Sequence, residues 1–247
     1  MLIDTHIHTG IFHHNNFSPE YVASLMDVIG VDYYAVSSTT ICIENYDLVL
    51  DEINTLQQLH KERVLPIMWI TPEGLRGNVW RLIDSKIRWR CLKVHPYLNP
   101  DAWDSSGKCF VEVLAIAREL CLPILIHTGN DSSCCSQRFE SLFESNKDVI
   151  FILAHGRPID QALKAIRLEN VYSDSAFMPI SDIQKIITSG LSDKLLWGTD
   201  MCIPKHFYPN IKLQTYYKSK LDELKKVSTQ KQYEKITCWN ARQVFNI

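Results

Sequence analysis

The sequence predicts an α/β fold in which eight parallel strands alternate with helices and close into a (β/α)8 barrel, the TIM barrel. Short apolar or β-branched segments recur along the whole chain, and each is followed by a segment with helical periodicity. The chain has 247 residues, close to the roughly 250 typical of such barrels. An open doubly wound sheet is the alternative, but no Gly-x-Gly-x-x-Gly pattern follows the first strand, which counts against a dinucleotide-binding version.

The first half of the chain supplies four of the predicted strands. The opening strand stops at Gly10, and a loop over 11–17 follows it. Ser18-Pro19-Glu20 then starts a helix with an N-cap, a proline in the first turn and an acid near the positive end of the dipole, and Gly30 ends that helix. Further strands are expected at 31–37, 64–70 and 89–95, and helices at 44–61, 74–85 and 108–120.

The second half repeats this rhythm. Strands are expected at 123–127, 149–155, 171–175 and 195–198, and helices at 136–146, 158–168 and 181–189. The segment 149–155 is almost wholly apolar, as expected of a strand that is buried on both faces. A lysine-rich tail from about Leu213 predicts extra C-terminal helices with a solvated outer face. With no low-complexity linker and no shift in composition, residues 1–247 are expected to form a single domain.

Composition excludes several functional classes. The formal net charge is −2, so no cationic field favours nucleic acid or a membrane surface. No apolar run approaches the roughly 20 residues of a transmembrane helix, and the first residues lack the basic region of a signal peptide. The eight cysteines match no zinc-finger spacing, so we expect mostly buried free thiols in a cytoplasmic protein, and favour free thiols for Cys134 and Cys135.

Polar side chains with metal-binding chemistry alternate along the first strand. Asp4, His6 and His8 are expected to share one face of it, because successive side chains point to opposite faces. Two imidazoles at this spacing can reach one ion. We expect Asp4 to accept the second ring N–H of one of them and so to fix its orientation.

Further candidate ligands lie where later strands end. His95, His127 and His155 end the fourth, fifth and sixth strands, and Asp200 follows the eighth. In a barrel the carboxyl ends of the strands form one open face, which carries the active site. A single strand histidine is more often a hydrogen-bonded core residue, but the joint set of nitrogen and oxygen ligands suits zinc or a similar divalent ion.

Five motifs carry a resemblance to a known family. They are Asp4-Thr5-His6-Ile7-His8, Leu92-Lys93-Val94-His95-Pro96, Ile126-His127-Thr128-Gly129, Leu153-Ala154-His155-Gly156 and Trp197-Gly198-Thr199-Asp200. In this order they resemble the amidohydrolase superfamily, most of all its amidohydrolase-2 (ACMSD-like) branch, to whose ending Asn240–Phe245 is similar. The resemblance spans the chain and implies a metal ion held by His6, His8, His127 and Asp200. His155 would ligate a second metal or contact the reacting water or substrate.

Lys93 lies in the region of strand four where some members of the superfamily carry a carboxylated, metal-bridging lysine. In the resembling branch an unmodified lysine is expected, and carboxylation is the alternative. TatD-like nucleases share the His-x-His start but place a glutamate on this strand, where the chain has Lys93 and His95.

These observations predict a metal-dependent hydrolase acting on an amide, ester or lactone carbonyl, with zinc as the expected ion and no nucleotide cofactor. Asp200 would transfer the proton of the attacking water, and His155 would orient the carbonyl. Lys93, His95 and Arg157 are candidate contacts for a small anionic substrate. A decarboxylase of aromatic or unsaturated acids, a TatD-like phosphoesterase and a non-catalytic metal-binding barrel are the alternatives. No nucleic acid or membrane partner is expected, and a homodimer stays open.

Overall fold

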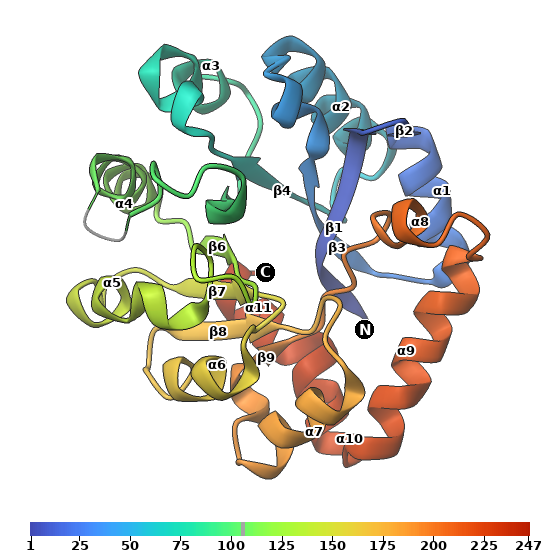
Figure 1. Cartoon of the computed structure of the whole chain (residues 1–247). Helices are drawn as coiled ribbons and strands as arrows, with labels where there is room; N and C mark the ends of the chain where they lie inside the picture. Colours follow the sequence, from blue (N-terminus) through green and yellow to red (C-terminus); the bar gives the residue numbers. More distant parts are fainter. Residues whose placement is uncertain (105–106) are drawn as a thin grey trace.

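A curled sheet of nine strands forms the centre of the computed structural model, which describes residues 1–104 and 107–247 (Figure 1). The strands are β1 Ile3–Phe12, β2 Asn15–Phe17, β3 Tyr33–Ser38, β4 Val64–Trp69, β5 Cys91–Val94, β6 Ile124–His127, β7 Phe151–Ala154, β8 Val171–Asp174 and β9 Leu195–Leu196. From β1 onward, β3 to β9 follow in chain order and pair in parallel, whereas β2 pairs with β1 antiparallel. The eight parallel strands confirm the predicted fold class.

Backbone hydrogen bonds join the first strand to the segment that follows β9. The amide of Thr5 donates to the carbonyl of Trp197 at 2.8 Å, and the amide of Asp200 donates to the carbonyl of His6 at 2.8 Å. Ile7 and Met201 form a further parallel bridge. Segments from opposite ends of the chain therefore run side by side and close the barrel.

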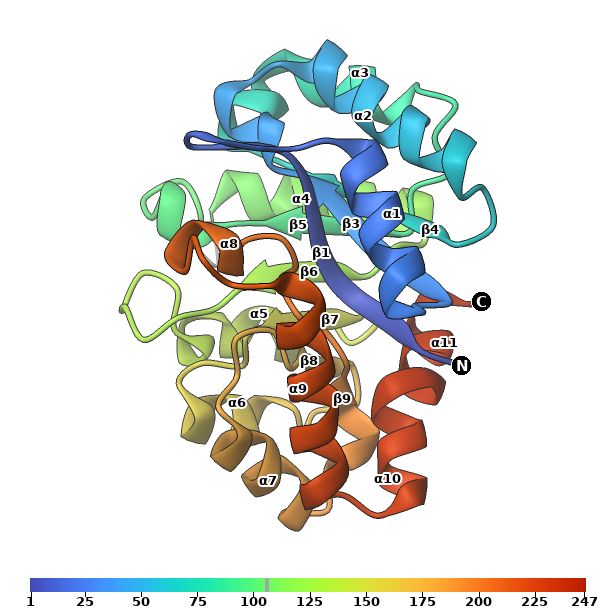
Figure 2. The same ribbon diagram turned by 90° about the vertical axis from the view of Figure 1, so that its right-hand side faces the viewer.

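Helices surround this sheet. Those that follow the strands up to β8 are α1 Pro19–Ile29, α2 Tyr46–Leu59, α3 Val79–Ile83, α4 Lys108–Leu120, α5 Glu140–Ser145, α6 Ile159–Ala165 and α7 Ile180–Thr188. The chain continues after β9 with α8 Pro204–Phe207, α9 Leu213–Val227, α10 Gln230–Glu234 and α11 Asn240–Phe245. The helices α9 to α11 are the predicted C-terminal additions, and α9 contacts both α1 and α7 (Figure 2). Among the described residues, no helix combines the length and the apolar character needed to span a lipid bilayer.

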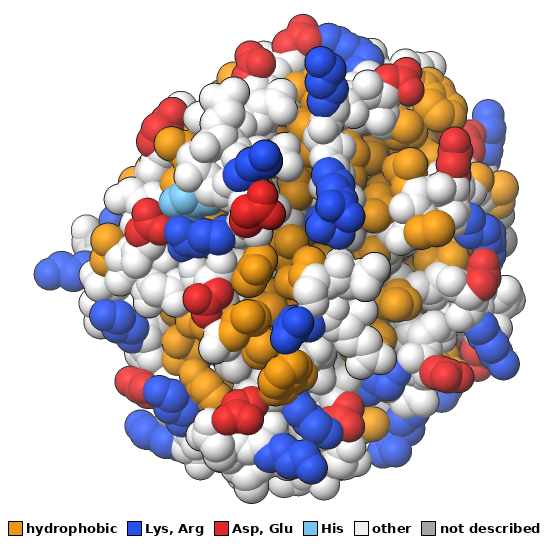
Figure 3. Space-filling view, turned by 180° about the vertical axis from the view of Figure 1, so that it is seen from behind, with side chains coloured by type: hydrophobic (Ala, Val, Ile, Leu, Met, Phe, Trp, Pro, Cys, Tyr) orange, Lys and Arg blue, Asp and Glu red, His pale blue; other side chains and the backbone are white. Residues whose placement is uncertain are grey.

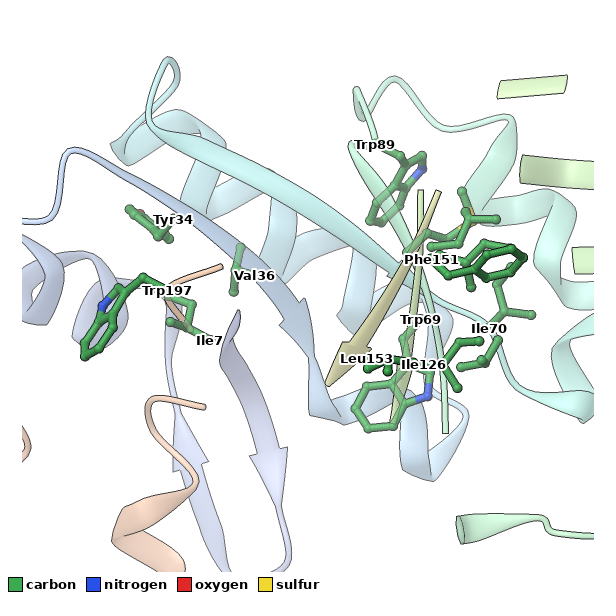
Figure 4. Packing of buried hydrophobic residues seen from close by; sticks show 14 of the residues in the cluster. Ile7, Tyr34, Val36, Trp69, Ile70, Trp89, Ile126, Phe151, Leu153 and Trp197 are labelled. Atoms are coloured by element: carbon green, nitrogen blue, oxygen red, sulfur yellow. The ribbon is translucent and has the colours of Figure 1, made fainter. Parts of the chain in front are cut away.

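The core has two layers because side chains alternate along each strand. On β7, Phe151 and Leu153 face the helices and pack in the larger cluster, part of which Figure 4 shows. Ile152 lies between them in sequence and faces the barrel interior, where it packs with residues of the other strands and with Phe245 of α11. The interior is thus closed where the strands begin. That face of the molecule carries scattered charges of both signs among hydrophobic side chains (Figure 3).

The opening strand differs from its prediction in two ways. It continues past Gly10 to Phe12 and turns back into β2, where a loop was expected. His13 has a φ of 54°, the left-handed conformation that tight hairpin turns use. The pairing of β1 with β3 also shifts register between Asp4 and Ile7, so a bulge interrupts the simple alternation of faces.

Candidate metal centre

A pocket of about 1120 Å³ opens at the carboxyl ends of the strands. It is lined by eight of the nine residues singled out from the sequence, namely His6, His8, Lys93, His95, His127, His155, Arg157 and Asp200. Apolar side chains complete its walls, among them Trp69 at the end of β4, Phe177 after β8 and Phe207 of α8. These eight residues therefore lie together at the end of the barrel where the strands finish, as expected, although their individual roles do not follow from this position.

Three of these residues form a tight, buried group. Nε2 of His8 lies 2.9 Å from Oδ1 of Asp200, and Nε2 of His6 lies 3.4 Å from the same oxygen. One ligand atom of each residue lies within 4.8 Å of those of the other two. Oδ1 of Asp200 is buried, and apart from these two ring nitrogens no described residue reaches it as a hydrogen-bond partner. Two imidazole nitrogens and a buried carboxylate oxygen around one point are a donor set that fits a divalent cation.

Hydrogen bonds on the far side of each imidazole direct both rings toward Asp200. Nδ1 of His6 lies 2.8 Å from Oδ2 of Asp174, and Nδ1 of His8 lies 3.0 Å from Oγ of Ser37. The other oxygen of Asp174 accepts from the backbone amides of His155 and Ala176 at 2.9 and 3.0 Å. A histidine held through its second nitrogen in this way presents the first to a metal.

Asp4 does not take the position expected of it. Its carboxylate accepts hydrogen bonds from Oγ1 of Thr199 at 2.6 Å and from the backbone amides of Thr199 and His6, and it contacts neither imidazole. The bulge after Asp4 turns it away from the face that carries His6 and His8. Burial raises the pKa of Asp4 to about 7. Asp174 makes the contact that was expected of Asp4.

Lys93 lies inside the group of ligands. Its Nζ is 3.1 Å from Nε2 of His6 and 3.2 Å from Nε2 of His8, and the residue is 2% exposed. The ammonium also lies over the ring of Trp69, 4.4 Å from the centroid. Burial lowers the pKa of Lys93 to about 8, while burial and the Lys93 charge lower that of His8 to about 3.

The remaining histidines form a second line beside the first group. Nε2 of His155 lies 3.2 Å from Nδ1 of His127, whose ring stacks on that of His95 with centroids 3.8 Å apart. His155 belongs with His6 and Asp174 to another group of potential ligands, whereas His127 belongs to neither group found in the described part of the chain. Burial lowers the pKa of His95 and of His127 well below the usual value, which favours neutral rings. Nδ1 of His95 is buried and has no partner among the described residues.

Two site residues adopt a backbone conformation that is rare outside glycine. The φ angles of His155 and Asp200 are 70° and 58°. His155 directly follows β7 and Asp200 lies four residues after the end of β9, and such strain is often found at functional sites. Arg157, two residues after His155, donates from Nη2 to the carbonyl of Phe177 at 2.5 Å. Arg157 also lines the pocket.

The sequence reasoning missed Asp174 and Ser37. Asp174 is the last residue of β8, and Ser37 is the last but one of β3. Their positions therefore carried the same signal that identified His127 and Asp200. A polar side chain at the carboxyl end of a barrel strand was sufficient reason to consider them.

Comparison with known proteins agrees with this geometry. The family model described as amidohydrolase (Amidohydro_2) matches residues 3–247. None of the curated protein sequences compared matches the chain.

Solved structures similar to this one include three with named activities. A probable 2-pyrone-4,6-dicarboxylic acid hydrolase from Acinetobacter baumannii, with citric acid bound, has a TM-score of 0.72 and 13% identity over 100% of this chain and 99% of its own. The 4-oxalomesaconate hydratase from Rhodopseudomonas palustris has a TM-score of 0.71 and 14% identity, over 100% of this chain and 96% of its own. A 5-carboxyvanillate decarboxylase from Novosphingobium aromaticivorans, complexed with manganese and a nitrobenzoic acid, has a TM-score of 0.70 and 10% identity, over 100% of this chain and 97% of its own. At these identities the likeness establishes the shared fold.

Proposed function

The chain belongs to the amidohydrolase family, and from this premise we propose that it is a metal-dependent hydrolase of small anionic substrates. The bond attacked would be an amide, ester or lactone carbonyl. The observation that carries the proposal is the convergence of His6, His8 and Asp200 around one buried point, where no described residue other than the two imidazoles reaches Oδ1 of Asp200.

His6, His8 and Asp200 would hold the ion, and we propose zinc because imidazole and carboxylate ligands suit it. His127 and His155 are proposed as further ligands or substrate contacts, since both line the pocket next to this group. When bound, such an ion polarises a carbonyl and makes water acidic enough to attack it near neutral pH.

Proton transfer is assigned to Asp200. Asp200 lines the pocket, and among the described residues only the two imidazole nitrogens reach its Oδ1. A carboxylate so placed can accept the proton of the attacking water and return it to the leaving group. His155 is held by the carbonyl of Ala176 at its Nδ1, and its Nε2, which lies 3.2 Å from Nδ1 of His127, would exchange that contact to orient the substrate.

The pocket wall supports an organic acid as substrate. Arg157 is anchored by one guanidinium nitrogen to the carbonyl of Phe177, and its other N–H groups can bind a carboxylate. Trp69, Phe177 and Phe207 provide flat apolar surface nearby. The compounds named with the similar structures, a pyrone dicarboxylic acid, citric acid and a nitrobenzoic acid, are all carboxylic acids.

A decarboxylase is the second candidate. A 5-carboxyvanillate decarboxylase shares the fold over the full length of this chain. The same metal and arginine contacts would then hold a carboxylate that is lost as carbon dioxide rather than a carbonyl that is attacked by water.

One experiment separates these candidates. The purified protein is analysed for metal content and then incubated with a panel of lactones, amides, esters and aromatic acids, with and without a chelator. We expect about one divalent ion per chain and hydrolysis that stops on chelation and returns with zinc. Carbon dioxide release without hydrolysis would assign the decarboxylase, and activity that survives complete removal of metal would contradict both.

A further inference from the structure

The amino group of Lys93 lies within hydrogen-bonding distance of two ring nitrogens of the proposed metal site, one in His6 and one in His8. Nζ lies 3.1 Å from Nε2 of His6 and 3.2 Å from Nε2 of His8. Asp174 is an acceptor when ionised, so its contact with Nδ1 of His6 leaves Nε2 of that ring with a free lone pair. Lys93 therefore donates to the lone pair that a metal ion would use.

We propose that the Lys93 ammonium is a built-in competitor of the metal ion, holding the site in order in the metal-free protein and withdrawing when the ion binds. The inference rests on the proposed function, since it concerns the same site. An imidazole nitrogen has one lone pair in the ring plane, so it cannot accept a hydrogen bond and bind a metal at the same time. Lys93 and the ion are thus alternative partners of the His6 ring, and Nζ lies almost as close to Nε2 of His8.

The surroundings of Lys93 give the displaced amino group a place to go. Nζ already lies 4.4 Å from the centroid of Trp69, on the face of the ring, where a cation is attracted to the π-electrons. Lys93 also lines the pocket, so its flexible stem can move toward the opening without crossing the core. Binding of the ion should therefore change the environment of Trp69.

The competing explanation makes the opposite prediction. If Lys93 were carboxylated, its new oxygen atoms would be ligands, and loss of the residue would weaken metal binding. As a competitor, its loss strengthens metal binding. The sign of the change in affinity decides between the two roles.

The test compares wild type, Lys93→Met and Lys205→Met as metal-free proteins, each titrated with Zn²⁺ and separately with Mn²⁺ in competition with a chromophoric chelator. Methionine preserves the length and apolar stem of lysine. Lys205 donates to the carbonyl of Ile211 and lies outside the pocket lining, so its variant controls for the loss of one positive charge. Lys93→Gln is a second variant should the first fold poorly, as judged by circular dichroism.

We expect Lys93→Met to bind the ion about 10- to 100-fold more tightly than wild type, the range of a hydrogen bond to a charged group. Lys205→Met should match wild type. The ion should alter the tryptophan fluorescence of wild type, and most of that change should be lost in Trp69→Phe and in Lys93→Met. Unchanged or weaker binding by folded Lys93 variants would overturn the inference while leaving the metal site intact. A wild type and variants that all fail to bind either ion would overturn the proposed function as well.

Discussion

Nδ1 of His6 lies 2.8 Å from Oδ2 of Asp174, although 168 residues separate the two along the chain. The contact joins the first parallel strand to the end of β8 and turns Nε2 of His6 toward Asp200. Asp174 also accepts hydrogen bonds from two backbone amides, and these hold its carboxylate in the position from which it orients the His6 ring. The ligand geometry thus depends on a residue that contacts no solvent.

Replacing Asp174 by asparagine should weaken metal binding. The amide keeps the shape of the side chain but loses the charge that holds the His6 ring, and loss of such a partner typically costs 10- to 100-fold in metal affinity. Affinity is measured by chelator competition. Asp160→Asn, which changes an exposed acid on α6, is the matched control and should bind as wild type does. Wild-type affinity in Asp174→Asn would contradict the assigned role.

Asp200→Asn should reduce kcat by about 10²- to 10⁴-fold, the contribution of a positioned general acid–base group. Asparagine retains the size of the side chain, so the thermal unfolding temperature of the metal-free variant should stay close to that of metal-free wild type. Steady-state kinetics on the substrate found in the screen, with metal content measured on the same sample, separates loss of the ion from loss of proton transfer. A variant of full activity would remove Asp200 from the mechanism.

Arg157→Met should raise KM for an anionic substrate by about tenfold or more, because a charge-assisted contact to a carboxylate is lost. The KM for a neutral ester of the same acid should change little. Arg157→Lys restores the charge without the planar pair of donors, and an intermediate KM is expected. Equal KM changes for the charged and neutral substrates would show that the variant acts through the Phe177 loop instead.

Gly10→Ala should destabilise the fold by more than Gly30→Ala. Both positions have positive φ, 91° and 85°, so alanine is strained in each by about 1–2 kcal/mol. A Cβ at Gly30 meets nothing within 4 Å, whereas one at Gly10 would meet Oγ1 of Thr40 and, at 2.7 Å, Oε2 of Glu52. Overpacking at Gly10 adds about 1–3 kcal/mol. Denaturant unfolding of both variants gives the difference in the free energy of unfolding directly. Equal decreases in the two variants would show that the side chains of Thr40 and Glu52 move aside at little cost.

The sequence allowed prediction of the barrel because its signals are local. Apolar runs, caps and periodicity placed each of the eight parallel strands within a few residues, and α4 has its predicted bounds. Strand ends then brought the ligands together, since parallel strands end on one face. The prediction for Asp4 was wrong because the bulge after it is set by the pairing of β1 with β3, which the sequence of β1 alone does not reveal. The inward direction of Lys93, by contrast, follows from the alternation of side chains along β5 and agrees with its predicted place on the same face as His95.

Closure of the barrel has a consequence for how the protein assembles. The amide of Asp200 donates to the carbonyl of His6, so the side chains of these two residues come together only after the segment that follows β9 has paired with β1. An ion bound there would favour the joined state over the open one by mass action and would raise the melting temperature in proportion to the logarithm of its concentration. Metal supply would then govern how long the newly made chain persists in its working form.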